Sequence, residues 1–346
     1  MRDLVDTCVE PALRTYPRSV LVIGIICRGQ QHVFGYGPVG AEWHGAPVGD
    51  TLFEIGSVTK VFTSALLATC VQKGLVRLDD PASSYLPPQA HLPDEVTLLA
   101  LATHTSGLPR LPGNIWRSWL RHPRNPYAAY TEPLLYAALN AYKPRRPAAG
   151  TFQYSNLGGG LLGYLLARAH ALPYADALQR EVCGPLGLTE TWIHVPPEHS
   201  QQLAPPRSAR GRLTSGWDAP VLAGAGALRS TARDLLRFLD ANLGDAPPDL
   251  AEPLEICQTI RAEAPAPMCG VGLGWMVSRW SADDDTTLLH WHDGATGGYS
   301  SFLGMVRSQG VGVVVLTNHG PDSYRRRNWP RSPGALGIEL LRALCR

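Results

Sequence analysis

The residues from Val58 to Val71 form a run that is apolar on nearly every side of a helix. Its apolar side chains include Val58, Val61, Phe62, Ala65, Leu66, Leu67 and Ala68. A helix that is apolar all round belongs in the interior of a protein. Gly74 follows at the position where helices commonly end in a left-handed conformation. We therefore expect a buried helix that begins near Ser57 and ends just before Gly74.

Ser57 and Lys60 lie at the start of this predicted helix. Residues three apart share a helix face, so the Lys60 amine can reach the Ser57 hydroxyl. Lysine is rare here, with three residues among 31 basic ones. A partly buried lysine can release its proton and activate a serine, whereas arginine cannot. The alternative is an ordinary serine cap with a lysine one turn later, and this short pattern alone does not decide between the two.

Predicted strands occur at both ends of the chain, and helices dominate the middle. Strands are indicated at 19–27, 32–37, 273–280, 286–292, 299–306 and 310–317, and helices at 158–171, 174–182, 230–239 and 334–344. This order predicts an α/β (α+β) fold, in which one antiparallel sheet is built from both chain ends and flanked by helices. We expect a discontinuous α/β domain over 1–80 and 260–346, with an all-helical domain inserted at 81–259.

Composition narrows the class of protein. With 45% hydrophobic and 17% charged residues, the chain has an ordinary globular composition, and its net charge of +2 gives no argument for nucleic acid. The seven cysteines are scattered and form no C-x-x-C, which argues against a disulfide framework or a zinc site. No signal peptide is recognisable, although a trimmed chain would look the same. We expect a cytoplasmic protein with a small-molecule substrate, no cofactor or metal, and neither nucleic acid nor membrane as a partner.

Three further stretches carry polar side chains suited to a site. Tyr154-Ser155-Asn156 precedes a glycine-rich helix, so that its tyrosine and asparagine can enter one cleft, although a loop tyrosine and a helix cap would look alike. The turn 103–109 is most simply explained by local bracing hydrogen bonds. The stretch 290–299 joins two strands, and its glycines allow a ligand to approach the backbone.

His290 and His292 share one face of the first of these two strands, where they can in principle bind a metal. No further ligands occur at a recognisable spacing, so we favour a single histidine at the edge of a cleft.

Together these stretches resemble the three motifs of the serine β-lactamase and penicillin-binding-protein superfamily, S-x-x-K, Y-x-N and K-T-G. They occur here, in the same order, as Ser57-x-x-Lys60, Tyr154-Ser155-Asn156 and His292-Asp293-Gly294. The resemblance is greatest to class C β-lactamases, related D-peptidases and carboxylesterases of that fold. It implies the β-lactamase/transpeptidase-like architecture and a serine hydrolase that works through an acyl-enzyme.

The resemblance also implies roles for individual residues. Ser57 would be the acylated nucleophile, and Lys60 its base or proton relay. Tyr154 would be the second proton-handling group, and Asn156 would bind Lys60 and the amide of the substrate. The backbone N–H groups of Ser57 and Ala295 would form the oxyanion hole.

The third motif departs from the family pattern. His292 replaces the lysine and Asp293 the threonine, so the substrate-binding stretch His292-Asp293-Gly294-Ala295 has no permanent cation. Because histidine is mostly neutral at pH 7, recognition of a carboxylate should weaken. We therefore expect hydrolysis of a small ester or amide. The alternatives are a true class C-type β-lactamase or D-amino-acid peptidase and, from another class, a non-catalytic ligand-binding protein on the same scaffold.

Overall fold

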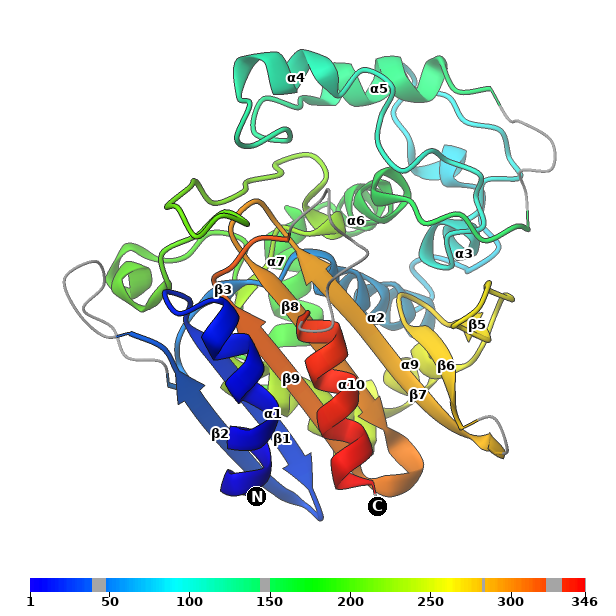
Figure 1. The fold of residues 1–346 in the computed structure, drawn as a ribbon. Helices are drawn as coiled ribbons and strands as arrows, with labels where there is room; N and C mark the ends of the chain where they lie inside the picture. Colours follow the sequence, from blue (N-terminus) through cyan, green and yellow to red (C-terminus); the bar gives the residue numbers. More distant parts are fainter. Residues whose placement is uncertain (39–47, 144–149, 282–283, 322–331, 346) are drawn as a thin grey trace.

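A seven-stranded antiparallel sheet forms the centre of the computed structural model, which describes residues 1–38, 48–143, 150–281, 284–321 and 332–345 (Figure 1). The strand order is β2-β1-β9-β8-β7-β6-β5. The strands are β1 (Leu21–Cys27), β2 (Gln30–Tyr36), β5 (Gly270–Val271), β6 (Met276–Ser281), β7 (Asp284–Ala295), β8 (Ser300–Val306) and β9 (Val311–Thr317).

The two ends of the chain meet within this sheet. β1 pairs with β2 through a hairpin whose turn residues Arg28 and Gly29 have φ angles of 53° and 71°. On its other edge β1 pairs with β9, from Leu21 opposite Thr317 to Ile26 opposite Gly312. The predicted sheet assembled from both termini is therefore confirmed, as is the four-strand meander from β6 to β9.

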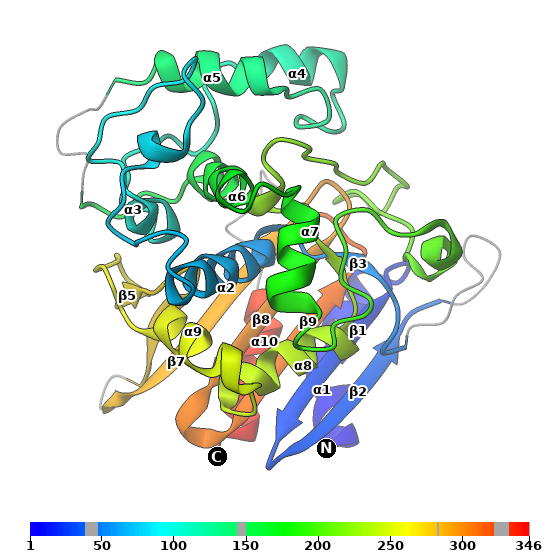
Figure 2. The same cartoon turned by 180° about the vertical axis from the view of Figure 1, so that it is seen from behind.

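Helices cover both faces of the sheet. The helices α1 (Arg2–Thr15) and α10 (Pro333–Leu344) lie on one face, side by side (Figure 1). The opposite face carries α2 (Thr59–Gln72), α8 (Ala232–Leu243) and α9 (Pro248–Gln258) (Figure 2). Because β1 and β9 are enclosed in this way, they are built almost entirely of buried Val, Ile, Leu and Gly.

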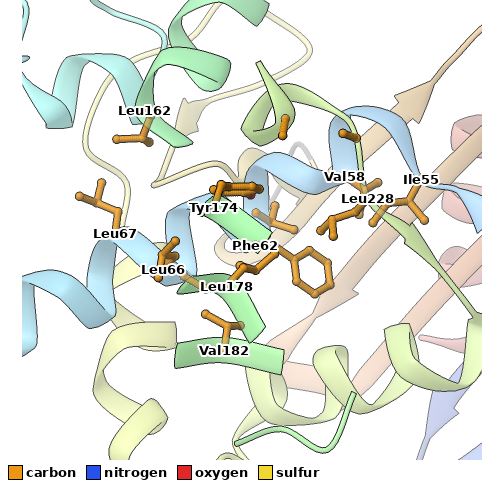
Figure 3. Packing of buried hydrophobic residues seen from close by; sticks show 14 of the residues in the cluster. Ile55, Val58, Phe62, Leu66, Leu67, Leu162, Tyr174, Leu178, Val182 and Leu228 are labelled. Carbon is orange, nitrogen blue, oxygen red and sulfur yellow. The ribbon is translucent and has the colours of Figure 1, made fainter. Parts of the chain in front are cut away.

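Helix α2 lies in the largest hydrophobic cluster, as its all-round apolar sequence predicted. Every residue from Thr59 to Cys70 is buried. Phe62 and Leu66 pack near Tyr174, Leu178 and Val182 from the neighbouring helical segment (Figure 3). The helix ends before Gly74, whose φ of +68° is the predicted left-handed stop.

The middle of the chain is mainly helical. It contains α3 (Leu98–Ala102), α4 (Trp116–Arg121), α5 (Glu132–Asn140), α6 (Asn156–His170) and α7 (Tyr174–Leu178), and a two-stranded sheet joins β3 (Phe53–Glu54) to β4 (Arg229–Ser230). Helix α8 falls within the range assigned to the helical domain, yet it packs on β1 and β9. The division into two domains stays a prediction, and this packing favours a second boundary before α8.

No helix in the described parts of the chain is long and apolar enough to cross a membrane.

Candidate active site

Ser57 lies in a short 3₁₀ turn, Gly56–Val58, which leads directly into α2. We expected it at the N-terminus of the helix itself, but α2 begins two residues later and the Ser57 side chain caps neither element. The turn is held by a hydrogen bond from the Ile55 N–H to the Leu228 carbonyl, 3.0 Å long. Gly56 has a φ of +50°, so the chain reverses sharply and leaves Ser57 partly exposed.

Lys60 is buried beside Ser57 and donates three hydrogen bonds. Its Nζ lies 3.1 Å from Ser57 Oγ, 2.9 Å from Asn156 Oδ1 and 2.6 Å from the Ala225 carbonyl oxygen. Burial, with a smaller contribution from the positive charge of Arg110, lowers the Lys60 pKa to about 7. The lysine can therefore exist in both protonation states near neutral pH, and this is the property that a proton acceptor for serine requires.

Tyr154 lies close to both Ser57 and Lys60, and its hydroxyl interacts with the Ser57 side chain. Burial raises the pKa of this tyrosine, so it carries its proton at neutral pH. The ring packs 4.5 Å from the His104 ring, between centroids. Lys60 Nζ lies 5.0 Å and the Arg110 guanidinium carbon 5.2 Å from the centre of the same ring.

Asn156 is the first residue of α6, next to Tyr154. Ser155 caps that helix, since its hydroxyl accepts the Gly158 N–H at 2.8 Å. The cap fixes the direction in which Asn156 points toward Lys60. A Cβ atom on Gly159 would lie only 2.9 Å from the Lys60 Cε, so glycine is needed where α6 passes α2.

His292 of β7 is fully buried, near Tyr154. Its ring centroid lies 6.1 Å from that of the tyrosine, and its Nδ1 donates to the Asp293 carbonyl at 2.6 Å. Burial, together with the positive charge of Lys60, lowers the His292 pKa to about 3. His292 is therefore uncharged at physiological pH. The Asp293 backbone, rather than its exposed side chain, contacts the ring.

The two histidines of β7 have separate surroundings. His290 Nε2 lies 3.0 Å from the Gln258 carbonyl, and its ring meets Trp275 edge-on. Within the described residues no group of three or more His, Cys, Asp or Glu side chains is placed to hold a metal ion.

The end of β7 passes directly beside the Ser57 turn. A Cβ atom on Gly56 would lie 2.5 Å from the Ala295 backbone nitrogen, and one on Gly294 would lie 2.0 Å from the Ile55 carbonyl oxygen. The backbones of Ser57 and Ala295 therefore lie close together, as a two-donor oxyanion hole requires. A hollow of about 370 Å³ opens in front of them, lined by Ser57, Tyr127, Asn156, Trp217, Ala219, Leu222, Ala225, Gly226 and Ala295.

Comparison with known proteins agrees with this arrangement. A model of the family described as Beta-lactamase matches residues 5–334. The chain belongs to the β-lactamase family. A β-lactamase from Pseudomonas fluorescens is 27% identical, over 92% of this chain and 93% of the relative. The Escherichia coli K12 D-alanyl-D-alanine-carboxypeptidase/endopeptidase AmpH is also 27% identical, over 86% of this chain and 79% of its own.

Solved structures of the β-lactamase family share the whole fold. The class C β-lactamase from Rhodobacter sphaeroides has a TM-score of 0.83 and 26% identity, with 99% of this chain and 98% of that chain covered. A β-lactamase/D-alanine carboxypeptidase from Pseudomonas syringae gives a TM-score of 0.80 over 99% of this chain and 98% of its own, at 23% identity. As a member of this family, the chain is a serine hydrolase that reacts through an acyl-enzyme, as the motifs predicted.

Several residues of this β-lactamase-family site were missed in the sequence. Tyr127 and Trp217 line the hollow and stack edge-on at 5.6 Å, yet each comes from a loop without periodicity. Ala225 contributes only a backbone carbonyl, which any residue type has. His104 lies in the turn that was interpreted as bracing. The turn does brace itself, with a 2.9 Å bond between the Thr103 and Thr105 hydroxyls, but its histidine ring also packs on Tyr154.

Proposed function

We propose that Ser57 attacks the carbonyl carbon of a small ester or amide and that Lys60 accepts the serine proton. The observation that carries this proposal is the buried Lys60 amine, 3.1 Å from Ser57 Oγ, with its pKa lowered to about 7. About half of the lysine is then neutral at pH 7. Tyr154 keeps its proton at that pH, so Lys60 is the better acceptor and Tyr154 serves as a proton donor.

The proposed reaction has two steps. In the first, Ser57 Oγ bonds to the acyl carbon, its proton passes to Lys60, and the leaving group departs with a proton from the Lys60–Tyr154 pair. In the second, a water oxygen bonds to the acyl carbon and passes one proton to this pair, the bond between Ser57 Oγ and the acyl carbon breaks, and Ser57 Oγ takes that proton from the pair as the acid leaves. The Ser57 and Ala295 N–H groups stabilise the negative oxygen in both steps, and removing one such donor typically costs about 3 kcal/mol.

The third-motif histidine supports a neutral acyl substrate over a β-lactam antibiotic. Its pKa of about 3 leaves His292 uncharged at physiological pH, where the family motif has a lysine. A carboxylate on the substrate would find no permanent charge at this position. Hydrolysis of β-lactams or of D-amino-acid peptides is the second candidate, and the names of the bacterial relatives favour it.

Labelling and turnover test this proposal together. The purified protein is treated with a fluorophosphonate and with a penicillin, and the adducts are located by mass spectrometry. Turnover of short p-nitrophenyl esters is compared with that of nitrocefin. We expect labelling at Ser57 and faster ester turnover, both abolished in Ser57→Ala and both retained in Ser84→Ala, which removes an exposed serine.

Three results would contradict this proposal. Labelling of Ser57→Ala at another serine would refute the nucleophile. Nitrocefin turnover that matches or exceeds ester turnover would favour the second candidate. Absence of labelling in the folded wild type would favour a non-catalytic binding protein.

A further inference from the structure

Helix α4 exposes its apolar side chains and buries a polar one. Trp116, Trp119 and Leu120 are 51%, 53% and 69% exposed, and their spacing of three and four residues places them on one face of the helix. Ser118 is fully buried instead, and its hydroxyl accepts the Ala129 N–H at 3.1 Å. Helices on the surface of soluble proteins normally show the opposite arrangement.

Exposed large hydrophobic side chains are concentrated around α4. Among the described residues nine large hydrophobic side chains are exposed, and four of them fall between Leu111 and Leu120. Helix α4 lies at the top of Figure 1, at the opposite end of the molecule from the lower ends of the sheet strands. A concentrated apolar patch of this kind marks an interaction surface, whereas scattered exposed side chains do not.

The patch is also strongly basic. Residues 110–124 contain four arginines and no acidic residue. Arg117, Arg121 and Arg124 are exposed, and no ion pair with another described residue engages them. Arg117 extends over the Trp116 ring, with its guanidinium carbon 5.4 Å from the ring centre. The apolar and basic side chains therefore share one surface.

We propose that this surface, the α4 face (Leu111, Trp116, Arg117, Trp119, Leu120 and Arg121), docks the enzyme on a membrane that contains anionic lipid. Tryptophan favours the boundary between headgroups and acyl chains, and arginine is attracted to the negative surface of such a membrane. The Trp119 indole N–H already donates to the Pro123 carbonyl at 3.0 Å, so this ring needs no water partner when it enters the boundary. A small apolar surface that also carries basic side chains binds an anionic membrane reversibly.

Charge argues against a second copy of the chain as the occupant. A symmetric dimer through this face would bring like patches together, arginines against arginines, and such pairs repel. The composition of the whole chain led us to expect no membrane partner. A net charge of +2 does not reveal that four arginines lie together between residues 110 and 124.

The segment that follows α4 reaches the active site. Trp217 lines the hollow in front of Ser57, and its indole N–H donates to the Arg124 carbonyl at 2.8 Å. Arg121 of the α4 face, three residues before Arg124, is therefore joined by a short segment to the wall of that hollow.

Co-sedimentation with vesicles tests the proposal. The protein is mixed with vesicles of phosphatidylcholine containing one third phosphatidylglycerol, or of phosphatidylcholine alone, at low and high NaCl. We expect binding to the anionic vesicles that weakens with salt. The triple variant Trp116→Ser/Trp119→Ser/Leu120→Ser should lower the partition coefficient at least about tenfold, and Arg117→Gln/Arg121→Gln should lower it about fivefold per arginine.

Control variants outside the α4 face test whether the loss of vesicle binding is specific to that face. Leu75→Ser and Ile260→Ser remove side chains that are 43% and 41% exposed elsewhere, and Arg28→Gln removes an exposed charge. These should bind like the wild type. Circular dichroism melting and p-nitrophenyl ester turnover show that each variant is folded.

The proposal is overturned if the wild type stays in the supernatant with anionic vesicles, or if the folded triple variant binds as well as the wild type. A dimer in sedimentation velocity that the triple variant abolishes, without vesicle binding by the wild type, would assign the face to a second copy instead.

Discussion

The ionisation of Lys60 depends on its surroundings more than on its motif. Any S-x-x-K helix brings a lysine to a serine, but here burial under Gly159 and the charge of Arg110 bring its pKa close to physiological pH. Its three acceptors, on Ser57, Asn156 and Ala225, match the three protons of the ammonium form. When the amine loses one proton, its free electron pair can accept the proton of Ser57.

The pH profile tests this role. A base with a pKa of about 7 is inactive when protonated, so kcat/KM for a neutral ester should rise with pH and level off above about pH 8. Removing the nearby positive charge in Arg110→Gln raises the Lys60 pKa and should move the rising limb to higher pH. Arg28→Gln, far from Tyr154, should leave it in place. A limb that does not move in Arg110→Gln would show that Lys60 does not control it.

Substitution of Lys60 separates charge from proton transfer. Lys60→Arg keeps a cation but cannot accept a proton, so it should be nearly as inactive as Lys60→Ala in ester turnover. Thermal melting of both variants shows whether the fold is retained. An arginine variant with most of the wild-type kcat would assign Lys60 a purely electrostatic role.

We expect His292 to influence how the site responds to a substrate carboxylate. Because its pKa is about 3, the wild type should show no activity limb from this residue between pH 5 and pH 9. His292→Lys restores a cation there and should raise kcat/KM for nitrocefin about tenfold relative to a neutral ester, since hydrogen bonds to charged groups contribute about 1.5–3 kcal/mol. His292→Gln, which stays neutral, should not change the ratio. Equal effects of His292→Lys on both substrates would contradict this.

At the scale of elements, the sequence predicted where the motifs lie but not everything that surrounds them. The pattern of the sequence predicted Ser57, Lys60, Asn156 and His292 near the ends of helices and a strand, and the resemblance to the family motifs implied that they meet in one site. Trp217 and Tyr127 come from irregular loops, whose course depends on tertiary packing. The burial that neutralises His292 is likewise a property of the packed sheet, because its neighbours come from distant parts of the chain.

Gly56 links the nucleophile turn to β7 and allows a test with a matched control. Alanine at this position is strained by its φ of +50° and its Cβ would lie 2.5 Å from the Ala295 nitrogen. Gly74→Ala has similar strain, at φ +68°, with no atom near its Cβ. Both should lose about 1 kcal/mol or more of stability. Only Gly56→Ala should also lower kcat at least about tenfold, measured well below its melting temperature. Similar kcat values in the two variants would mean that this contact does not shape the oxyanion hole.

At the scale of the molecule, we expect the helices packed on the back of the sheet to unfold together with the site, because they contact the sheet that carries it. Val9 of α1 is 1% exposed, whereas Val48 is 49% exposed. Val9→Ala should destabilise the protein by about 1–2 kcal/mol through the loss of two buried methyl groups, and Val48→Ala by much less. We expect ester turnover and the far-ultraviolet circular dichroism signal of Val9→Ala to be lost at the same lowered temperature. Loss at two separate temperatures would show that the layers unfold independently.

The pairing of β1 with β9 has a consequence for biosynthesis. β1 can form its hairpin with β2 as soon as both leave the ribosome, but its second neighbour is encoded almost 300 residues later. At about 5–20 residues per second, the strand waits roughly 15–60 s with the backbone N–H and C=O groups of this edge unpaired. Ser57 and Lys60 are also made early, while β7, which completes their site, comes near the end. We therefore expect the nascent chain to be inactive until its last strands emerge, and its unpaired strand edge to be most prone to aggregation in this interval.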